Sequence, residues 1–256
     1  MAGRVLVDIA TTGGPATLRA AELDPDAARS AMVLWDQNHV PVGVDAHFHA
    51  FDANLRRALG GMGVAAPAEA LILEVDRAVD AGRSWQLGLA VIHALLAADR
   101  LATSEDEADR VIWVTGAVGT SAWEAQPVEA VTAKLARSAG RFAELAERGL
   151  PVEVIVPAAH REEARAAAPA QVRVTGIGPV AGLVAELTAP ETAPPRPRTP
   201  PPRRRGAAAL LLLAAVAGAG ALMADRIGPA VTGLMAAVSA GGASGSPPTG
   251  YGAPPA

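Results

Sequence analysis

Short apolar runs alternate with longer amphipathic stretches along the first 187 residues of the chain. Short runs rich in Val, Ile and Leu are typical of buried strands, whereas apolar positions that recur at helical spacing are typical of helices. The pattern predicts strands over residues 4–9, 32–35, 70–75, 111–114, 152–156 and 172–174. It predicts helices over residues 45–59, 84–98, 127–148, 158–168 and 179–187. This alternation favours one α/β domain, residues 1–187, in which helices cover a mixed sheet.

Two residues mark the ends of the longest predicted helix. Gly149 follows its last position, and a glycine there commonly ends a helix in the left-handed conformation. Pro127 begins the stretch, and the first turn is the part of a helix that tolerates proline. These two signals predict one continuous helix over residues 127–148.

The chain changes character after residue 187. Residues 188–205 are rich in proline and arginine, which is typical of an extended linker. Residues 206–224 read GAAALLLLAAVAGAGALMA, without a charge, and approach the roughly 20 residues that a membrane-spanning helix needs. A buried helix of a soluble domain is the alternative, but such a helix normally has a polar face and this stretch has none. The pattern therefore predicts a single transmembrane helix over residues 206–224.

Charges beside this stretch predict its orientation. Arg203, Arg204 and Arg205 immediately precede it. Positive charge is retained on the cytoplasmic side of a membrane, so residues 1–187 are expected in the cytoplasm and the tail, residues 225–256, on the other side. The first residues lack the apolar run of a secretory signal, which agrees with that placement. Residues 227–240 form a second, shorter apolar stretch, and the pattern leaves open whether it also enters the membrane.

Composition excludes several classes of function. The net charge of −4 provides no basic surface for nucleic acid. The chain has no cysteine, which rules out disulfides, cysteine-ligated zinc and thiol nucleophiles. It contains neither a Walker motif nor a Gly-x-Gly-x-x-Gly motif, so no nucleotide or other cofactor is expected.

One cluster of residues has the composition of a metal site. Asp45, His47, His49 and Asp52 lie close together in the sequence, but two histidines separated by one residue point about 200° apart on a helix. A solvated helix face is the other interpretation, and no metal ion is expected. His93 lies inside an apolar helix, which favours a packed core histidine over a catalytic base.

Lysine usage singles out one residue. Of the 22 basic residues, 21 are arginine and only Lys134 is lysine. Arginine and lysine serve almost equally as surface charge, but only a buried lysine can lose its proton near neutral pH. Lys134 is therefore a candidate general base, and an ordinary surface position is the alternative.

Ser84 is a candidate nucleophile. It follows a short polar turn that contains Gly82, and it directly precedes an apolar helix. Serine is also a preferred residue for capping the start of a helix, so the sequence alone leaves both roles open. In either role the hydroxyl lies beside free backbone N–H groups, which are suited to stabilising an oxyanion.

Four segments resemble the proteolytic domain of Lon-type peptidases. In chain order they read GRSWQL at 82–87, VIWVTGAV at 111–118, QPVEAVTAKLA at 126–136 and GLPVEVIVP at 149–157. They are similar to the family's nucleophile turn, its strand ending in Thr-Gly, its lysine segment and its following strand ending in proline. The resemblance covers about residues 70–187. It implies the family's compact α/β fold and a Ser–Lys dyad, with Ser84 as nucleophile and Lys134 as base.

Several positions depart from the family pattern. An ungapped match places the family's catalytic lysine on Thr132, so Lys134 falls two residues later, about 200° around a regular helix. The other departures, where the family has small residues, are Trp85, Gln86, Glu129 and Ala130. These changes leave two hypotheses: a helix that begins differently and moves the base, or a domain that has lost catalysis.

The resemblance implies a peptidase that lacks its own ATPase, because Lon enzymes unfold substrates with an ATPase that has no counterpart in this sequence. Such a peptidase would cut flexible polypeptide segments or act beside a separate membrane ATPase. The alternative is a Lon-like domain without catalysis that serves as a membrane-tethered adaptor or assembly scaffold. Lon-like domains often form rings, so a homo-oligomer is also consistent with the resemblance.

Overall fold

Ten strands and six α-helices form the part of the chain that the computed structural model describes, residues 3–37, 40, 42, 45–79 and 81–190. The strands are β1 (Val5–Thr11), β2 (Gly14–Asp24), β3 (Ala31–Leu34), β4 (Ala70–Val75), β5 (Leu101–Ala102), β6 (Arg110–Val114), β7 (Ala117–Gly119), β8 (Glu124–Gln126), β9 (Val152–Pro157) and β10 (Arg173–Ile177). The helices are α1 (Asp45–Gly61), α2 (Gln86–Ala97), α3 (Val131–Arg137), α4 (Ala139–Glu147), α5 (Arg161–Ala167) and α6 (Val180–Thr188), with a 3-10 turn, η1 (Ala158–His160), before α5.

Eight of the strands form one mixed sheet. Its order is β10-β9-β6-β1-β2-β4-β3, and β5 also pairs with β1. Strands β1, β6, β9 and β10 are parallel to one another, whereas β2 runs antiparallel to both β1 and β4. Strands β7 and β8 form a separate hairpin. The predicted α/β class with a mixed sheet is therefore confirmed.

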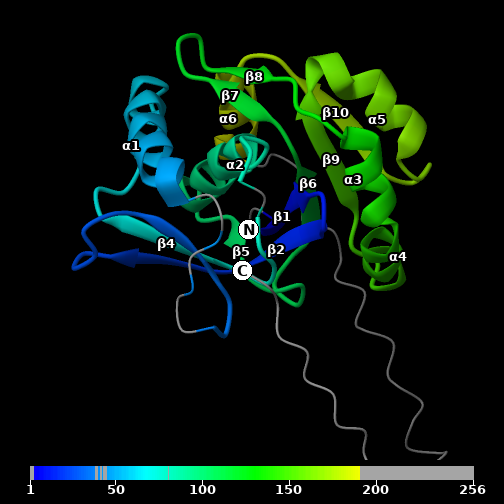
Figure 1. The fold of residues 1–256 in the computed structure, drawn as a ribbon, viewed down its shortest axis with the longest axis horizontal. Helices are drawn as coiled ribbons and strands as arrows, with labels where there is room; N and C mark the ends of the chain where they lie inside the picture. Colours follow the sequence, from blue (N-terminus) through cyan, green and yellow to red (C-terminus); the bar gives the residue numbers. More distant parts are fainter. Residues whose placement is uncertain (1–2, 38–39, 41, 43–44, 80, 191–256) are drawn as a thin grey trace, which may run out of the picture. The chain divides into compact units, whose positions relative to one another are not determined.

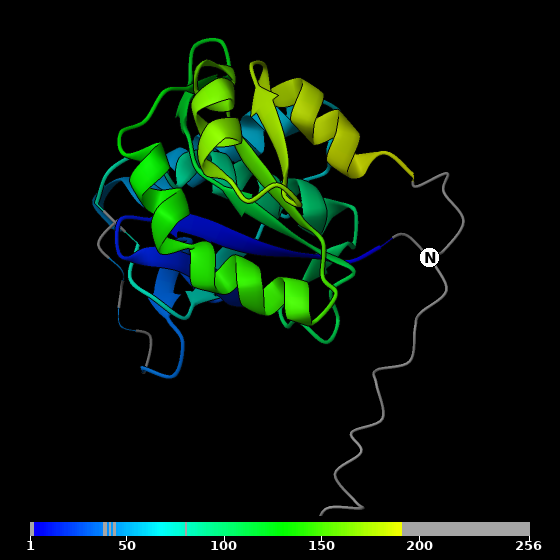
Figure 2. The same ribbon diagram turned by 90° about the vertical axis from the view of Figure 1, so that its right-hand side faces the viewer.

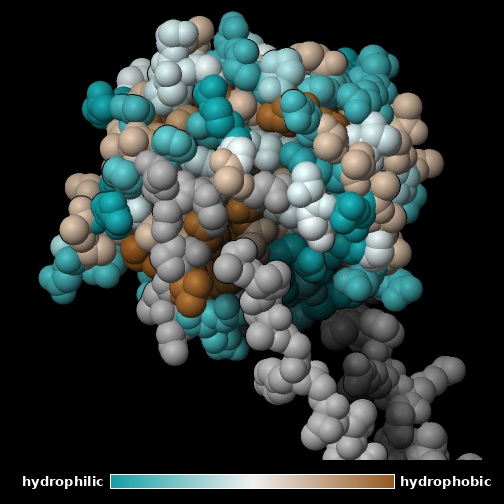
Figure 3. Space-filling model, in the orientation of Figure 1, coloured by the Kyte–Doolittle hydropathy of each residue, from teal (hydrophilic) through white to brown (hydrophobic). Residues whose placement is uncertain are grey.

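Helices cover both faces of this sheet (Figure 1). Helices α1, α2 and α6 share one hydrophobic core, and α3, α4 and α5 share the other. Strand β1 supplies both cores, because Val7 and Ile9 lie in the first while Leu6 and Ala10 lie in the second, as strand alternation requires. Figure 2 views the sheet from the α3–α4 side. Figure 3 shows one face of the molecule, on which hydrophilic and hydrophobic residues are mixed.

All six predicted strands are present, as β1, β3, β4, β6, β9 and β10. Strands β2, β5, β7 and β8 were not predicted. The sequence of β2, GPATLRAAELD, has no continuous apolar run, and its second half is mostly half-buried or exposed. Strand β2 pairs with β1 and β4 through backbone hydrogen bonds. The hydropathy of its side chains gives no sign of this pairing.

The prediction of one continuous helix over residues 127–148 is wrong. Ser138 separates α3 from α4, and Pro127 lies before the helix rather than in its first turn. Helix α3 begins at Val131, after Ala130, which adopts a left-handed conformation with φ 59° and ψ 32°. The prediction for Gly149 is confirmed, because this residue has φ 71° and its N–H donates to the Ala146 carbonyl at 3.0 Å.

The predicted transmembrane helix, residues 206–224, and the tail, residues 225–256, lie outside the described residues. Within residues 3–37, 40, 42, 45–79 and 81–190, no helix has both the length and the apolar character that spanning a membrane requires.

Candidate active site

The parallel strands β1, β6 and β9 end at the same edge of the sheet, where Thr115 and Gly116 continue from β6. The Thr115 side chain is fully buried, and its N–H donates to the Ile155 carbonyl of β9 at 3.1 Å. This edge is where α/β proteins commonly bind ligands. The two candidate catalytic residues approach Thr115 and Gly116 from opposite faces of the sheet.

Ser84 approaches from the α2 side. It is only 7% exposed and lies in the turn before α2. The Gly116 N–H donates to the Ser84 carbonyl at 2.8 Å, and the Leu87 N–H donates to the Gly116 carbonyl at 3.0 Å. The residue at the cap position of α2 is Trp85, and no side chain caps this helix. The capping role considered for Ser84 is therefore wrong.

Gly116 allows this close approach of β6 and α2. A Cβ atom added at this position would lie 2.9 Å from Leu87 Cδ2 and 3.1 Å from Pro157 Cγ. Carbon atoms in proteins do not approach so closely without displacing one another. The glycine of the Thr-Gly pair thus fixes the backbone of Ser84 against the end of β6.

Lys134 approaches from the α3 side. Its side chain is 3% exposed, and its Nζ donates to Thr115 Oγ1 at 3.4 Å. Val131 and Leu135 lie on the same buried face of α3, whereas Thr132 is exposed and donates to Glu163 Oε1 at 2.7 Å. The position that matches the family's lysine therefore points outward, and Lys134 points inward. The surface position considered for Lys134 is wrong.

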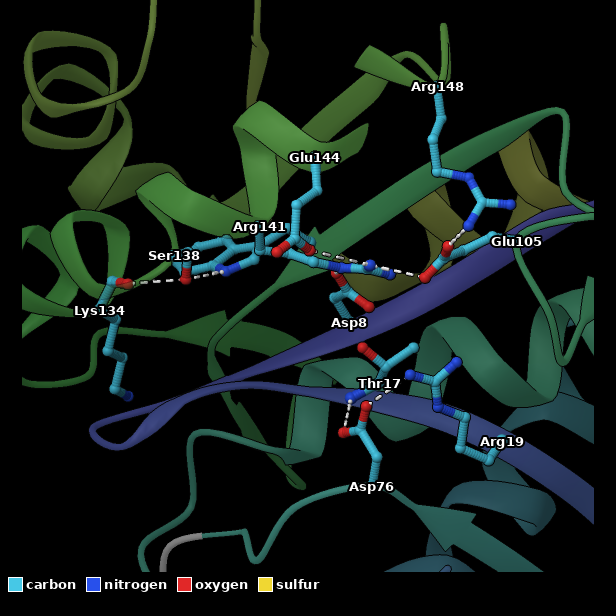
Figure 4. Close-up of polar contacts among 11 residues, drawn as sticks. Asp8, Thr17, Arg19, Asp76, Glu105, Lys134, Ser138, Arg141, Glu144 and Arg148 are labelled. Carbon is cyan, nitrogen blue, oxygen red and sulfur yellow. Dashed lines mark hydrogen bonds and ion pairs between the residues drawn. The ribbon is translucent and has the colours of Figure 1, made fainter. Parts of the chain in front are cut away.

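The structure thus brings Ser84 and Lys134 to two consecutive residues, Gly116 and Thr115. In Figure 4 the Lys134 amine extends away from the start of α4, while the Lys134 carbonyl accepts a hydrogen bond from the Ser138 hydroxyl at 2.8 Å. Thr115 was not singled out as a functional residue. Its signal was the Thr-Gly ending of the strand over residues 111–114.

The departures that follow Ser84 have structural roles. Trp85 packs its ring against Phe48 and Phe51 and donates from Nε1 to the Gly82 carbonyl at 2.6 Å. Gln86 Oε1 accepts the Val118 N–H at 3.0 Å. These contacts hold the turn that carries Ser84 against the rest of the fold.

A buried ion pair lies beneath α4, on the same face of the sheet as Lys134 (Figure 4). Arg141 Nε donates to Asp8 Oδ2 at 3.1 Å, and its Nη1 donates to Glu105 Oε1 at 2.6 Å. Burial raises the pKa of Asp8, although the Arg141 charge opposes this effect. The sequence offered one signal for this pair, an aspartate inside the apolar run of β1, and none for Arg141. The pair holds α4 against β1.

The cluster considered for a metal ion lies on α1. His47 is exposed, whereas Asp52 is fully buried and its Oδ1 lies 2.6 Å from His93 Nε2. The interpretation of this cluster as a solvated helix face is therefore wrong for Asp52. The prediction that His93 is a packed core histidine is confirmed, because it is 1% exposed. In the described part of the chain, no three His, Asp or Glu side chains are grouped to hold a metal ion.

Neither a protein-family model nor a curated protein matches this chain. The resemblance to Lon-type peptidases therefore rests on the four quoted segments. Three of those segments supply the residues that meet at the end of β6: Ser84, Thr115 with Gly116, and Lys134.

Proposed function

We propose that this chain is a membrane-anchored Lon-like serine peptidase that hydrolyses peptide bonds with a Ser84–Lys134 dyad. One observation carries the proposal. The only lysine of the chain is buried, and its amine contacts Thr115, while the next residue, Gly116, hydrogen-bonds the backbone of Ser84. A lysine that served only as surface charge would be expected at an exposed position. A general base has to be buried to lose its proton near neutral pH.

The burial of Lys134 supports its role as base. Burial disfavours the charged form of an amine, and Val131 and Leu135 provide apolar neighbours on the same face of α3. Leu87, which is fully buried, adds an apolar wall on the Ser84 side. An amine that is neutral near pH 7 can accept a proton from a serine hydroxyl.

The proposed reaction is acyl transfer in two steps. Ser84 Oγ attacks the peptide carbonyl carbon while its proton moves to Lys134 Nζ, and backbone N–H groups of the turn around Ser84 stabilise the oxyanion. The C–N bond then breaks, the amine product leaves with the proton from Lys134, and an acyl ester remains on Ser84. Water then attacks the ester carbonyl as Lys134 takes its proton, the bond to Ser84 Oγ breaks, Lys134 returns the proton to Ser84 Oγ, and the carboxylic acid product leaves.

The proposed substrate is a flexible polypeptide segment, because the chain carries no Walker motif for an ATPase of its own. A separate membrane ATPase is the proposed partner for folded substrates. Residues 206–224 would anchor the chain in the membrane with residues 1–187 on the cytoplasmic side. A homo-oligomer is compatible with this arrangement.

Substitution of the two dyad residues tests the proposal. In a peptidase assay with an unstructured fluorogenic protein, Ser84→Ala should reduce cleavage to background. Lys134→Arg places a group there that stays protonated and cannot act as a base, so it should reduce cleavage about 10²- to 10⁴-fold. Matched controls are Ser121→Ala and Arg137→Lys, both at exposed positions, which should leave the rate unchanged. A fluorophosphonate should label Ser84, as located by mass spectrometry.

The second candidate is a non-catalytic adaptor or scaffold. The large residues Trp85 and Gln86, where the family has small ones, favour it. Under this hypothesis Ser84→Ala and Lys134→Arg leave partner capture unchanged, and no fluorophosphonate adduct forms. Full cleavage by Lys134→Arg would exclude lysine as the base.

A further inference from the structure

The start of α3 is held by residues from η1 and α5. The Val128 N–H donates to His160 Nε2 at 3.1 Å, and Thr132 Oγ1 donates to Glu163 Oε1 at 2.7 Å. His160 Nδ1 lies 2.9 Å from Glu163 Oε2. Because Nε2 accepts a backbone N–H, the ring proton is on Nδ1 and donates to Glu163. We call His160 and Glu163 the α3 clamp.

Helix α3 has no cap of its own. Its cap position is Ala130, in the left-handed conformation that non-glycine residues adopt at an energetic cost, and no side chain of the segment caps the helix. Glu163 supplies a carboxylate at the first turn instead, where negative charge is favourable. Hydrogen bonds from Thr132 and His160 lower the pKa of Glu163, so its carboxylate is charged at neutral pH.

The clamp contacts the outward face of α3. Thr132 is turned outward toward Glu163, and two residues along a helix correspond to a rotation of roughly 200°. Lys134 lies on the inward face with Val131 and Leu135, and its Nζ reaches Thr115. The Lys134 N–H donates to the Ala130 carbonyl at 2.9 Å, so the clamped turn is also the first hydrogen-bonded turn that carries Lys134.

We propose that His160 and Glu163 are positioning residues that aim the Lys134 amine at Thr115 and Ser84. This inference rests on the proposed Ser–Lys peptidase and extends it to two residues outside the dyad. It bears on the two-residue offset of Lys134 from the family pattern, because α3 begins at Val131 and presents Thr132 to the clamp and Lys134 to Thr115.

Kinetics of clamp variants test this role. His160→Ala and Glu163→Ala should lower kcat about 10- to 100-fold with KM unchanged. A small displacement of the Lys134 amine slows proton transfer without changing how the substrate binds. His160→Gln places an amide oxygen near the position of Nε2, so it should accept the Val128 N–H and restore most of kcat. Glu162→Ala is the matched control, because Glu162 is a neighbouring exposed carboxylate of α5.

A second measurement does not depend on catalysis. Lys134 is the only lysine, so an amine-selective reagent reports on it directly, with the N-terminal amine as internal reference. In a Ser84→Ala background, modification of Lys134 should be slow with the native clamp, faster in His160→Ala and Glu163→Ala, and slow again in His160→Gln. Mass spectrometry after proteolysis separates the two amines.

The two measurements separate the proposals. If kcat and the modification rate of His160→Ala and Glu163→Ala equal those of Glu162→Ala, the positioning role is overturned, even for an active peptidase. If the native chain shows no Ser84-dependent cleavage but the modification rates follow the expected order, the peptidase proposal fails and the placement of Lys134 by the clamp stands.

Discussion

At the scale of single residues, Asp52 contacts a histidine and an arginine inside the protein. Its Oδ1 lies 2.6 Å from His93 Nε2, and its Oδ2 lies 2.7 Å from Arg56 Nη2. Burial alone raises the pKa of Asp52, but the hydrogen bond from His93 and the Arg56 charge bring this pKa below its ordinary value. The ionised carboxylate is therefore the form that stabilises the fold.

Asp52→Asn should destabilise the protein in a pH-dependent way. At pH 7 we expect a loss of about 3 kcal/mol in the free energy of unfolding, because the substitution removes the buried carboxylate that faces His93 and Arg56. A lowered folded pKa means that Asp52 contributes stability above its unfolded pKa, near 3.8, and loses that contribution as pH falls through the folded value. Urea unfolding at pH 7 and near pH 3 measures the difference.

The difference in the free energy of unfolding between the native and Asp52→Asn proteins should be smaller at the lower pH. Asp106→Asn is the control, since the Asp106 side chain is 91% exposed and its substitution should change little. A gap that stays constant between the two pH values would show that Asp52 acts by shape rather than by charge.

The sequence predicted some of the buried polar residues and not others. Lys134 stood out because the chain otherwise uses only arginine as its long basic residue. Arg141 and Glu105 did not stand out, because their roles depend on contacts with Asp8 and with each other across 133 and 36 positions. Such contacts are determined by the fold, and a local pattern carries no record of them.

At the scale of elements, the joint between β6 and α2 depends on Gly116. We expect Gly116→Ala to destabilise the protein by about 1–3 kcal/mol, because its Cβ would lie 2.9 Å from Leu87 Cδ2 in a packed core. The same shift would loosen the hydrogen bond to the Ser84 carbonyl, so peptidase activity should fall together with stability. Thermal unfolding and the cleavage assay measure the two effects.

Gly140→Ala provides the matched comparison. Gly140 lies inside α4, and an added Cβ there meets no atom within 4 Å. Alanine in a helix interior should therefore stabilise the protein by about 0.5–1 kcal/mol. If both substitutions changed stability in the same direction, close approach would not be the reason for glycine at position 116.

The break between α3 and α4 shows why the sequence predicted one helix where there are two. The apolar spacing continues through Ser138, so periodicity gives no sign of a boundary. Ser138 is occupied by tertiary contacts instead: Trp113 Nε1 donates to its hydroxyl at 2.9 Å, and the hydroxyl donates to the Lys134 carbonyl. The start of α3 was mispredicted for a similar reason, because Glu163 and His160 hold it from another part of the chain.

At the scale of the whole molecule, the alternation of short apolar runs and amphipathic stretches was sufficient to predict a mixed sheet covered by helices. Strand order was not predictable in this way, since β6 lies between β1 and β9 through crossovers of many residues. The site follows from that order. Ser84 and Lys134 approach from opposite faces of the sheet, and each contacts one of the two residues that follow β6, Gly116 and Thr115.

The proposed anchor gives the last prediction. Residues 206–224 are expected to span the membrane, so the full chain should sediment with membranes and resist extraction by carbonate. Leu213→Arg places a charge near the middle of this stretch, which should disfavour insertion by about 2.5–3.5 kcal/mol and shift most of the protein to the soluble fraction. Ser244→Arg, in the tail beyond the stretch, is the matched control and should leave the protein in the membrane. Replacing Arg203, Arg204 and Arg205 with glutamine should weaken the preference for a cytoplasmic N-terminal domain, as read by protease protection of a C-terminal tag. Equal sedimentation of the native and Leu213→Arg chains would mean that another part of the protein, or a partner, provides the attachment.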